Sequence, residues 1–279
     1  MNTSRKYFRC GLLIILGTIL LSCATTGPGG KKSFILISES QEIELGESVS
    51  QQVLEQEKPL TDDQWQSYLT EVGKKVVAVS DRSALPFHFT VLDNDQINAF
   101  ATPGGYLFFY TGILRMMESE DELAAVMAHE ISHVVGRHSV KTIQTYYGGA
   151  IAANILLGDQ ADKEIGKITE IVFGLALRGY GRSNEHEADQ YGLHYMTKAG
   201  YNPQAMVTMF EKLASASGDR ESNFFEGLLS THPDTKDRIS RMKNQIAAMP
   251  PENANRPLIK SKYAQMKSRL PAPAEKKEP

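Results

Sequence analysis

The side chains of His129, Glu130 and His133 have the types and spacing of a metal-dependent hydrolytic site. Residues four apart on an α-helix return to nearly the same side, so the two imidazoles would aim at one point with Glu130 beside it. Two neutral imidazoles are good Zn²⁺ ligands, and a neighbouring carboxylate can take the proton of a water that attacks a carbonyl. In a chain with 7 His, this H-E-x-x-H pattern is rare by chance. The alternative is a surface helix whose histidines have ordinary partners.

A catalytic zinc needs a third protein ligand and leaves its fourth position open. Residues 182–189 offer Glu185 and Asp189, which are four apart and share a helix face, whereas Glu187 points elsewhere. We predict that Glu185 is the third ligand and that Asp189 accepts a hydrogen bond from a ligand histidine. The alternative is a plain helix start, in which Ser183 is the N-cap and the acids lie in the first turn.

The helix that carries the two histidines has its own end signals. Ser119 followed by Glu122 predicts a capping box, and Glu120 and Asp121 place negative charge at the positive end of the helix dipole. Gly136 and the basic residues after it indicate the end. The apolar residues form one stripe, namely Leu123, Val126, Met127, Ile131, Val134 and Val135. Because the stripe buries most of the helix, its polar groups need a partner, and a metal ion is the most economical one.

Together these segments resemble the zinc peptidases related to the CAAX prenyl protease, in the soluble periplasmic lipoprotein branch of that family. The resemblance rests on His129-Glu130-x-x-His133, on Glu185-x-x-Ala188-Asp189, and on residues 98–105 and 231–233, and it covers roughly residues 40–245. It implies that His129, His133 and Glu185 bind one Zn²⁺ per chain, that Glu130 is the general base and that Asp189 is a catalytic acid. It also implies a mainly helical α+β fold of the zincin-like (gluzincin) type, with a small β-sheet beside the zinc-binding helix.

His232 is a further candidate catalytic residue, at the expected start of the last helix of the domain. It precedes Pro233, where the chain can turn a side chain into the cleft. There His232 would either donate a hydrogen bond to the oxyanion of the tetrahedral intermediate or bind the zinc and block it. The alternative is an ordinary histidine at a helix start.

The first 22 residues have the pattern of a lipoprotein signal peptide, with basic residues before an apolar run over 11–21. That run is shorter than the about 20 apolar residues that span a membrane. We predict cleavage before Cys23, which would carry the lipid, and Ala24 favours the outer membrane by resemblance to bacterial sorting signals. Because Cys10 would be removed, neither a disulfide nor thiolate zinc ligands are expected. The alternative is a short N-terminal anchor with an incidental cysteine.

After the signal peptide we predict a flexible tether over 23–37, a metallopeptidase domain over 38–248 and a mobile tail over 249–279, with a short helix near 259–270. The domain would open with two helices within 38–79, separated at Pro59. A strand at 86–91 follows, and then a hairpin of 97–101 and 106–110 around Pro103-Gly104-Gly105. In a protease this hairpin would hold an extended peptide beside the zinc; otherwise it is a plain structural hairpin.

Two apolar runs, over 146–157 and 165–177, lie between the two metal-binding segments. Each is too short to span a membrane, so we interpret them as helices that roof the active-site cleft. The alternative is a lid that contacts the membrane surface.

These features predict a periplasmic zinc endopeptidase, lipid-anchored at the outer membrane, that cleaves exposed or misfolded envelope proteins. The formal net charge of −3 gives no reason to expect nucleic acid as a partner. The alternative function is a chaperone or assembly factor for outer-membrane proteins, with a mainly structural or regulated zinc site and the outer-membrane assembly machinery as its partner. A complete ligand set with a base favours the enzyme, since a structural site needs neither a base nor an open coordination position.

Overall fold

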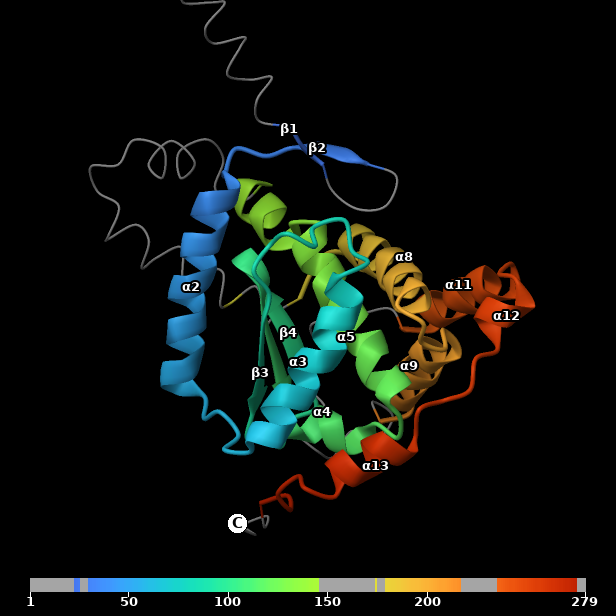
Figure 1. The fold of residues 1–279 in the computed structure, drawn as a ribbon. Coiled ribbons are helices and arrows are strands. Elements are labelled where there is room, and N and C mark those ends of the chain that lie inside the picture. Colours follow the sequence, from blue (N-terminus) through green and yellow to red (C-terminus); the bar gives the residue numbers. More distant parts are fainter. Residues whose placement is uncertain (1–22, 26–29, 146–173, 175–178, 217–234, 275–279) are drawn as a thin grey trace, which may run out of the picture.

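A three-stranded mixed sheet lies between layers of helices (Figure 1). The structure is a computed structural model that describes residues 23–25, 30–145, 174, 179–216 and 235–274. The strands are β3 (His88–Leu92), β4 (Ala99–Thr102) and β5 (Tyr106–Tyr110), in the spatial order β3-β5-β4. β5 pairs with β3 in parallel and with β4 in antiparallel. The predicted strand and hairpin are confirmed.

The alternation of side chains along these strands gives the sheet two buried faces. Helix α2 (Glu39–Gln56) covers one face, where its Leu45, Val49 and Val53 join Phe100 and Phe108 of the sheet. Helices α3 (Asp63–Val77) and α5 (Glu120–Val135) pack on the other face against the side chains of Val91, Leu107 and Phe109. Both faces of the sheet are therefore apolar, and α5 packs on one of them.

The turn between β4 and β5 needs its glycines. A short 3₁₀ segment, Pro103–Gly105, makes the turn, with φ of 73° at Gly104 and 96° at Gly105. Both values lie in the left-handed region that favours glycine. On the facing helix α2, a Cβ at Gly46 would lie 2.0 Å from the carbonyl oxygen of Pro103. Glycine at position 46 therefore lets α2 pack directly on this turn.

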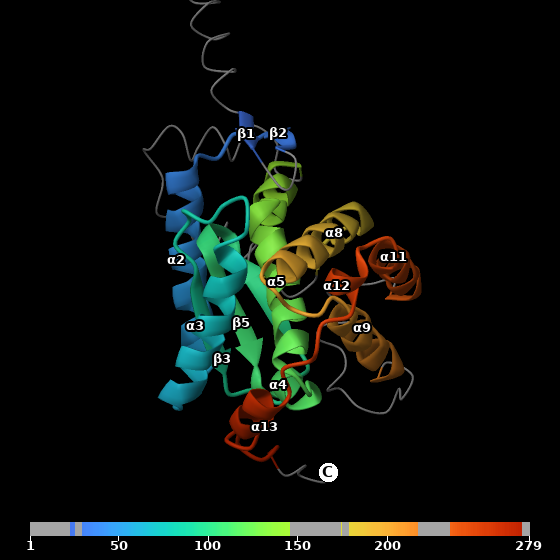
Figure 2. The same cartoon turned by 45° about the vertical axis from the view of Figure 1, so that its right-hand side comes forward.

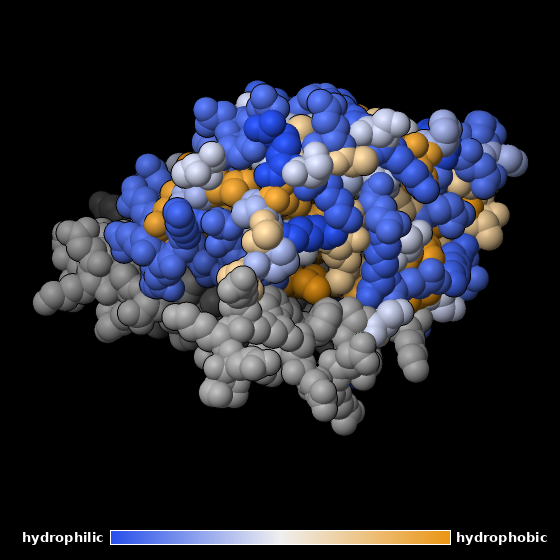
Figure 3. All heavy atoms as spheres, turned by 90° about the horizontal axis from the view of Figure 1, so that it is seen from below, coloured by the Kyte–Doolittle hydropathy of each residue, from blue (hydrophilic) through white to orange (hydrophobic). Residues whose placement is uncertain are grey.

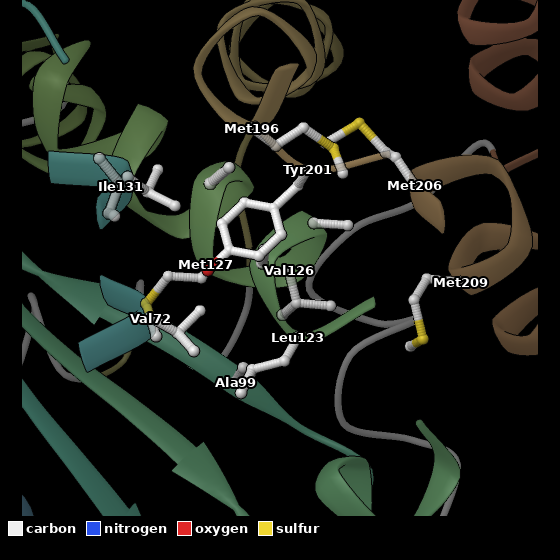
Figure 4. Close-up of a cluster of buried hydrophobic side chains, with 14 of the residues drawn as sticks. Val72, Ala99, Leu123, Val126, Met127, Ile131, Met196, Tyr201, Met206 and Met209 are labelled. Carbon is white, nitrogen blue, oxygen red and sulfur yellow. The ribbon is translucent and has the colours of Figure 1, made fainter. Parts of the chain in front are cut away.

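On the side of α5 away from α2 lie α8 (Arg182–Lys198), α9 (Gln204–Ala216) and α11 (Thr235–Ala247) (Figure 2). The methionines of α8 and α9, Met196, Met206 and Met209, gather with Leu123 and Val126 of α5 in one buried cluster (Figure 4). A Cβ at Gly192 of α8 would lie 3.1 Å from the backbone nitrogen of His129 and 3.0 Å from Met206 Cε. The glycine thus sets how closely α8 approaches the histidine-bearing helix.

The start of α5 differs from the predicted capping box. Ser119 caps it, because its hydroxyl accepts the backbone N–H of Glu122. The Glu122 carboxylate does not return to Ser119; it accepts the backbone N–H of Glu118 and pairs with Lys212. Glu120 is 1% exposed and accepts hydrogen bonds from the hydroxyls of Tyr68 and Tyr201. Instead of only meeting the helix dipole, the acids tie α5 to α3 and α9.

The C-terminal region is packed against the domain, which corrects the prediction of a mobile tail for residues 249–274. Helix α12 spans Pro251–Ala254 and α13 spans Ser261–Lys267, so the short helix predicted near 259–270 is confirmed. Tyr263 is 0% exposed, packs edge-on against Trp65 and donates its hydroxyl to the carbonyl of Leu114 in the short helix α4 (Thr111–Met116). The Pro- and Lys-rich composition suggested a solvated chain, but its few apolar side chains complete the core.

The N-terminal tether prediction also needs correction for its last residues. Strands β1 (Cys23–Thr25) and β2 (Lys32–Phe34) pair in antiparallel, and Ile35 and Ile37 are each 3% exposed in the core beneath α2. The folded domain therefore begins before residue 38. The predicted signal peptide, residues 146–157, nearly all of 165–177, and His232 lie outside the described residues.

The outer surface is mainly hydrophilic on the face seen in Figure 3, with hydrophobic side chains showing only in scattered spots. Large exposed apolar residues of the described chain are few, namely Phe34, Leu54, Leu258 and Ile259. Within the described residues, no helix has the length and apolar character that crossing a membrane requires.

Candidate metal centre

Helices α5 and α8 bring His129, His133 and Glu185 together. The Nε2 atoms of the two histidines lie 3.1 Å apart. Glu185 faces both of them, with one carboxylate oxygen 3.6 Å from His129 Nε2 and the other 3.5 Å from His133 Nε2. All three side chains are buried. The three ligands predicted from the sequence thus converge on one point.

The size of this triangle fits a zinc ion. Four ligands at about 2.0–2.1 Å from a tetrahedral Zn²⁺ stand about 3.3 Å from one another. The three separations given above, 3.1, 3.5 and 3.6 Å, lie close to that value. Two imidazoles and a carboxylate are also a ligand set that catalytic zinc uses. Within the part of the chain that the structure describes, His129, His133 and Glu185 are the group of side chains close enough together to hold a metal ion.

Asp189 and Arg238 support the His129 side of the centre. An oxygen of Asp189 lies 3.1 Å from His129 Nδ1, so the ring can turn its other nitrogen toward the metal point. Arg238 of α11 donates two hydrogen bonds of 2.7 Å to Asp189, and its third nitrogen lies 3.0 Å from Glu185. The guanidinium also stacks over Phe210 at 4.4 Å. One arginine of α11 therefore holds both Glu185 and Asp189 of α8.

The electrostatic balance of this cluster favours positive charge. Burial alone lowers the pKa of His129, but hydrogen bonds with Asp189 and Glu185 outweigh it and raise this pKa to about 9. For Asp189, burial raises the pKa, and the Arg238 hydrogen bonds and charge outweigh that effect, so the carboxyl stays ionised. A proton or a metal cation is thus stabilised at the point between the ligands.

The His133 side has different neighbours. Its ring stacks on Tyr180, with ring centroids 4.2 Å apart, and Tyr180 shares a 2.6 Å hydrogen bond with Ser139. Its Nδ1 lies 2.8 Å from Nδ1 of His138, which in turn contacts Glu187. Glu187 does lie on another face of α8 than Glu185, as predicted, but that face is turned toward this part of the centre.

Glu130 follows His129 on α5 and is 1% exposed. Its negative charge reaches both sides of the centre. Burial is the main cause that raises the pKa of Tyr180, and the charges of Glu130 and Glu185 raise it further. Burial lowers the pKa of Arg238, but Asp189, Glu185 and Glu130 outweigh burial and raise it. Because Glu130 directly follows His129 on α5, its side chain lies about 100° around the helix from that of the ligand.

Several side chains of the centre were not predicted. Tyr180, His138 and Glu187 showed no spacing that links them to the histidines, because their contacts are made in three dimensions. Arg238 had a usable signal: it is four residues before Met242 and eight before Ile246, so it lies on the buried face of α11. A charged residue on a core stripe needs a charged partner.

The other described histidines stay out of the centre. His88 is exposed on β3, where its ring stacks on Tyr106, and His194 is exposed on α8. His186 lies 3.5 Å from Asp237.

Comparison with known proteins bears on the same part of the chain. Residues 63–246 match peptidase family M48, and this range includes every side chain of the centre described above. The chain belongs to peptidase family M48. The predicted relationship to this group of metallopeptidases is confirmed, as is the predicted mainly helical fold with a small sheet beside the histidine-bearing helix.

Three M48 relatives show the range of similarity. The Beta-barrel assembly-enhancing protease of Escherichia coli (strain K12) is 30% identical over 224 residues, which is 77% of this chain and 46% of the relative. The Mitochondrial metalloendopeptidase OMA1 of Schizosaccharomyces pombe is 36% identical over 181 residues, 64% of this chain and 52% of the relative. The Metalloprotease YcaL of E. coli (strain K12) is 27% identical over 190 residues, 64% of this chain and 72% of the relative. The chain thus spans about half the length of the first two.

Proposed function

We propose that this M48 protein is a zinc-dependent endopeptidase that hydrolyses internal peptide bonds of polypeptides. The observation that carries the proposal is the convergence of His129, His133 and Glu185 on one point, with Glu130 next to it on the same helix. A zinc ion held by these three ligands would polarise the scissile carbonyl and acidify a water. A purely structural site would need no base and no open position.

The other residues of the site have separate roles in the proposed reaction. Glu130 takes a proton from the attacking water and passes it to the leaving amine. Asp189 orients His129, and its ion pair with Arg238 keeps it ionised. For the proton-donor role that the sequence resemblance implies, Asp189 would first have to take up a proton. On the sequence alone, His232 is proposed to stabilise the oxyanion or to block the zinc. Kinetics of His232→Ala across pH 5–8, where an ordinary histidine titrates, test this role.

The proposed location and substrates rest on the sequence and the relatives. A lipid on Cys23 would anchor the protein on the periplasmic side of the outer membrane, where exposed or misfolded envelope proteins would be its substrates. The name of the E. coli Beta-barrel assembly-enhancing protease supports an envelope role. Membrane fractionation of the wild type and of Cys23→Ala tests the anchor. Recovery of both in the soluble fraction would contradict it.

A second function draws on the same relative, whose name joins assembly with proteolysis. The protein would then assist outer-membrane proteins as a chaperone or assembly factor, beside their assembly machinery, and the zinc would be structural or regulated. The two functions differ in whether peptide bonds are cleaved.

The test is Glu130→Gln in the purified full-length chain, assayed on unfolded casein. This change removes a proton acceptor but no ligand, so one zinc per chain and normal thermal unfolding should remain. Hydrolysis should fall by about 10²–10⁴-fold, the contribution of a general base.

The matched control is Glu118→Gln, because this neighbouring acid has a side chain that is 68% exposed and lies outside the centre. It should keep full activity. A Glu130→Gln protein as active as the control would refute the proposed mechanism, and a zinc-loaded wild type that cleaves nothing would favour the chaperone.

A further inference from the structure

His133 has a polar neighbour, His138, on the side of its ring that faces away from the metal point. Its Nδ1 lies 2.8 Å from Nδ1 of His138, and Nε2 of His138 lies 2.8 Å from a carboxylate oxygen of Glu187. His138 is 0% exposed and Glu187 is largely buried, with a side chain that is 11% exposed. We call these three side chains the His133–His138–Glu187 relay. It joins the end of α5 to the first turns of α8.

The hydrogen bonds of the relay permit one arrangement of protons in neutral rings if His133 binds a metal. A ring that offers Nε2 to a metal carries its single proton on Nδ1. That N–H donates to Nδ1 of His138, so His138 must carry its own proton on Nε2, where it donates to Glu187. Each link then has one donor and one acceptor. The opposite arrangement would place a proton on His133 Nε2, the atom that faces His129 and Glu185.

The backbone conformation after α5 places the His138 side chain next to His133. Arg137 has φ of 53°, a left-handed conformation that is uncommon for a residue other than glycine. Its side chain is held there by the carbonyl of Ile37 at 2.6 Å and by Glu42 at 2.8 Å. A Cβ at Gly136 would lie 2.4 Å from His138 Nε2, so the ring folds back directly over the glycine. Residues that end one helix therefore also place the relay.

We propose that His138 and Glu187 are positioning residues of the metal centre. They hold the ring of His133 in the orientation and tautomer that bind the metal, as Asp189 does for His129. Each histidine ligand thus has a carboxylate support of its own, direct for His129 and through His138 for His133. This inference rests on the proposed zinc site.

The test measures zinc affinity in the purified full-length chain by competition with a chromogenic chelator. His138→Leu removes the acceptor for His133 at similar size and should weaken zinc binding by about 10–100-fold, the usual effect of losing such a support. His138→Asn places an amide oxygen near the former Nδ1 and should recover part of the affinity. Glu187→Gln should weaken binding in the wild type but add little to His138→Leu, because both act through one chain of contacts.

Two further readouts separate positioning from folding. The visible absorption bands of the Co²⁺-loaded protein should shift in His138→Leu, because the His133 ligand reorients. Thermal unfolding of the zinc-free protein measures damage to the fold alone. The matched control is Lys31→Ala, which removes the 2.6 Å partner of the other Glu187 oxygen, an ammonium on a side chain that is 63% exposed. Because such pairs contribute little, the control should stay within about twofold of the wild-type zinc affinity.

The outcomes are distinct. If His138→Leu keeps the wild-type zinc affinity and Co²⁺ spectrum, or only lowers the zinc-free unfolding temperature, the relay is wrong while the zinc site stands. If the wild type itself binds no zinc, the site and the relay fall together.

Discussion

At Arg238 a guanidinium with no exposed side-chain surface lies between the carboxylates of Glu185 and Asp189. Taking three charges out of water is unfavourable, and the hydrogen bonds among them offset that loss. Removing the arginine would leave two like charges buried together. Arg238 therefore bears directly on the stability of the fold.

We expect Arg238→Met to lower the free energy of unfolding of the zinc-free protein by about 3–5 kcal/mol, as when one partner of a buried ion pair is removed. Urea denaturation measures the loss. Saturating zinc should restore part of it, because a bound cation supplies positive charge beside Glu185.

The control for this prediction is Arg241→Met on the same helix. Arg241 pairs with Asp237, and both side chains are more than half exposed, so its loss should change stability by at most about 1 kcal/mol. Equal effects of the two substitutions would show that the buried pair does not contribute as described.

Gly192 affects the metal centre through helix packing, because it sets the distance between α8 and α5. A methyl group there would meet the His129 backbone nitrogen at 3.1 Å and its Cα at 3.2 Å. Met206 can bend away, but the backbone of His129 cannot move without moving a metal ligand.

Gly192→Ala should therefore cost about 1–3 kcal/mol of folding stability, as overpacking does, and should also weaken zinc binding. Denaturation and chelator competition measure the two effects. Gly181→Ala is the control for zinc affinity, because nothing lies within 4 Å of a Cβ at that end of α8. Zinc affinity unchanged in Gly192→Ala would mean that α8 and α5 adjust independently of the ligands.

Elements with strong local signals were predictable from the sequence. The H-E-x-x-H helix, its Ser119 cap and the hairpin follow from residue spacing, which short-range geometry fixes. Glu185 was chosen because it shares a helix face with Asp189 and because the sequence resembles a known family. Glu122 was given the wrong partner, because Lys212, ninety residues away, offers a charge that the capping box cannot match. Arg238, His138 and Glu187 were missed for the same reason: their partners come from packing between helices, which one sequence does not encode locally.

The C-terminal region closes the core of the molecule on the side of α3 and α4. Tyr263 lies against Trp65 and Tyr68. Ile259 makes two hydrogen bonds with the start of α5: its carbonyl accepts the backbone N–H of Glu120, and its own N–H donates to the side-chain carboxylate of Asp121. Composition alone assigned this region to solvent, since aromatic side chains are sparse in it.

We expect Tyr263→Ala to destabilise the protein by about 3–5 kcal/mol, the range for removing a buried aromatic ring. Tyr263→Phe removes the hydrogen bond to Leu114 and should cost about 1 kcal/mol. Guanidinium denaturation distinguishes the two. If Tyr263→Ala left the free energy of unfolding unchanged, the C-terminal region would not be part of the core, as the sequence prediction of a mobile tail had it.

The late position of these residues in the chain bears on when the protein can become active. During synthesis the N-terminal parts of a chain emerge first, and contacts between distant residues form last. Helix α5, with His129 and Glu130, leaves the ribosome more than a hundred residues before Arg238 and Tyr263 do. Until then Glu185 lacks its ion pair with Arg238, and the start of α5 lacks its contacts with the C-terminal region. A growing chain would thus carry its histidines before Arg238 can hold Glu185 and Asp189 in place.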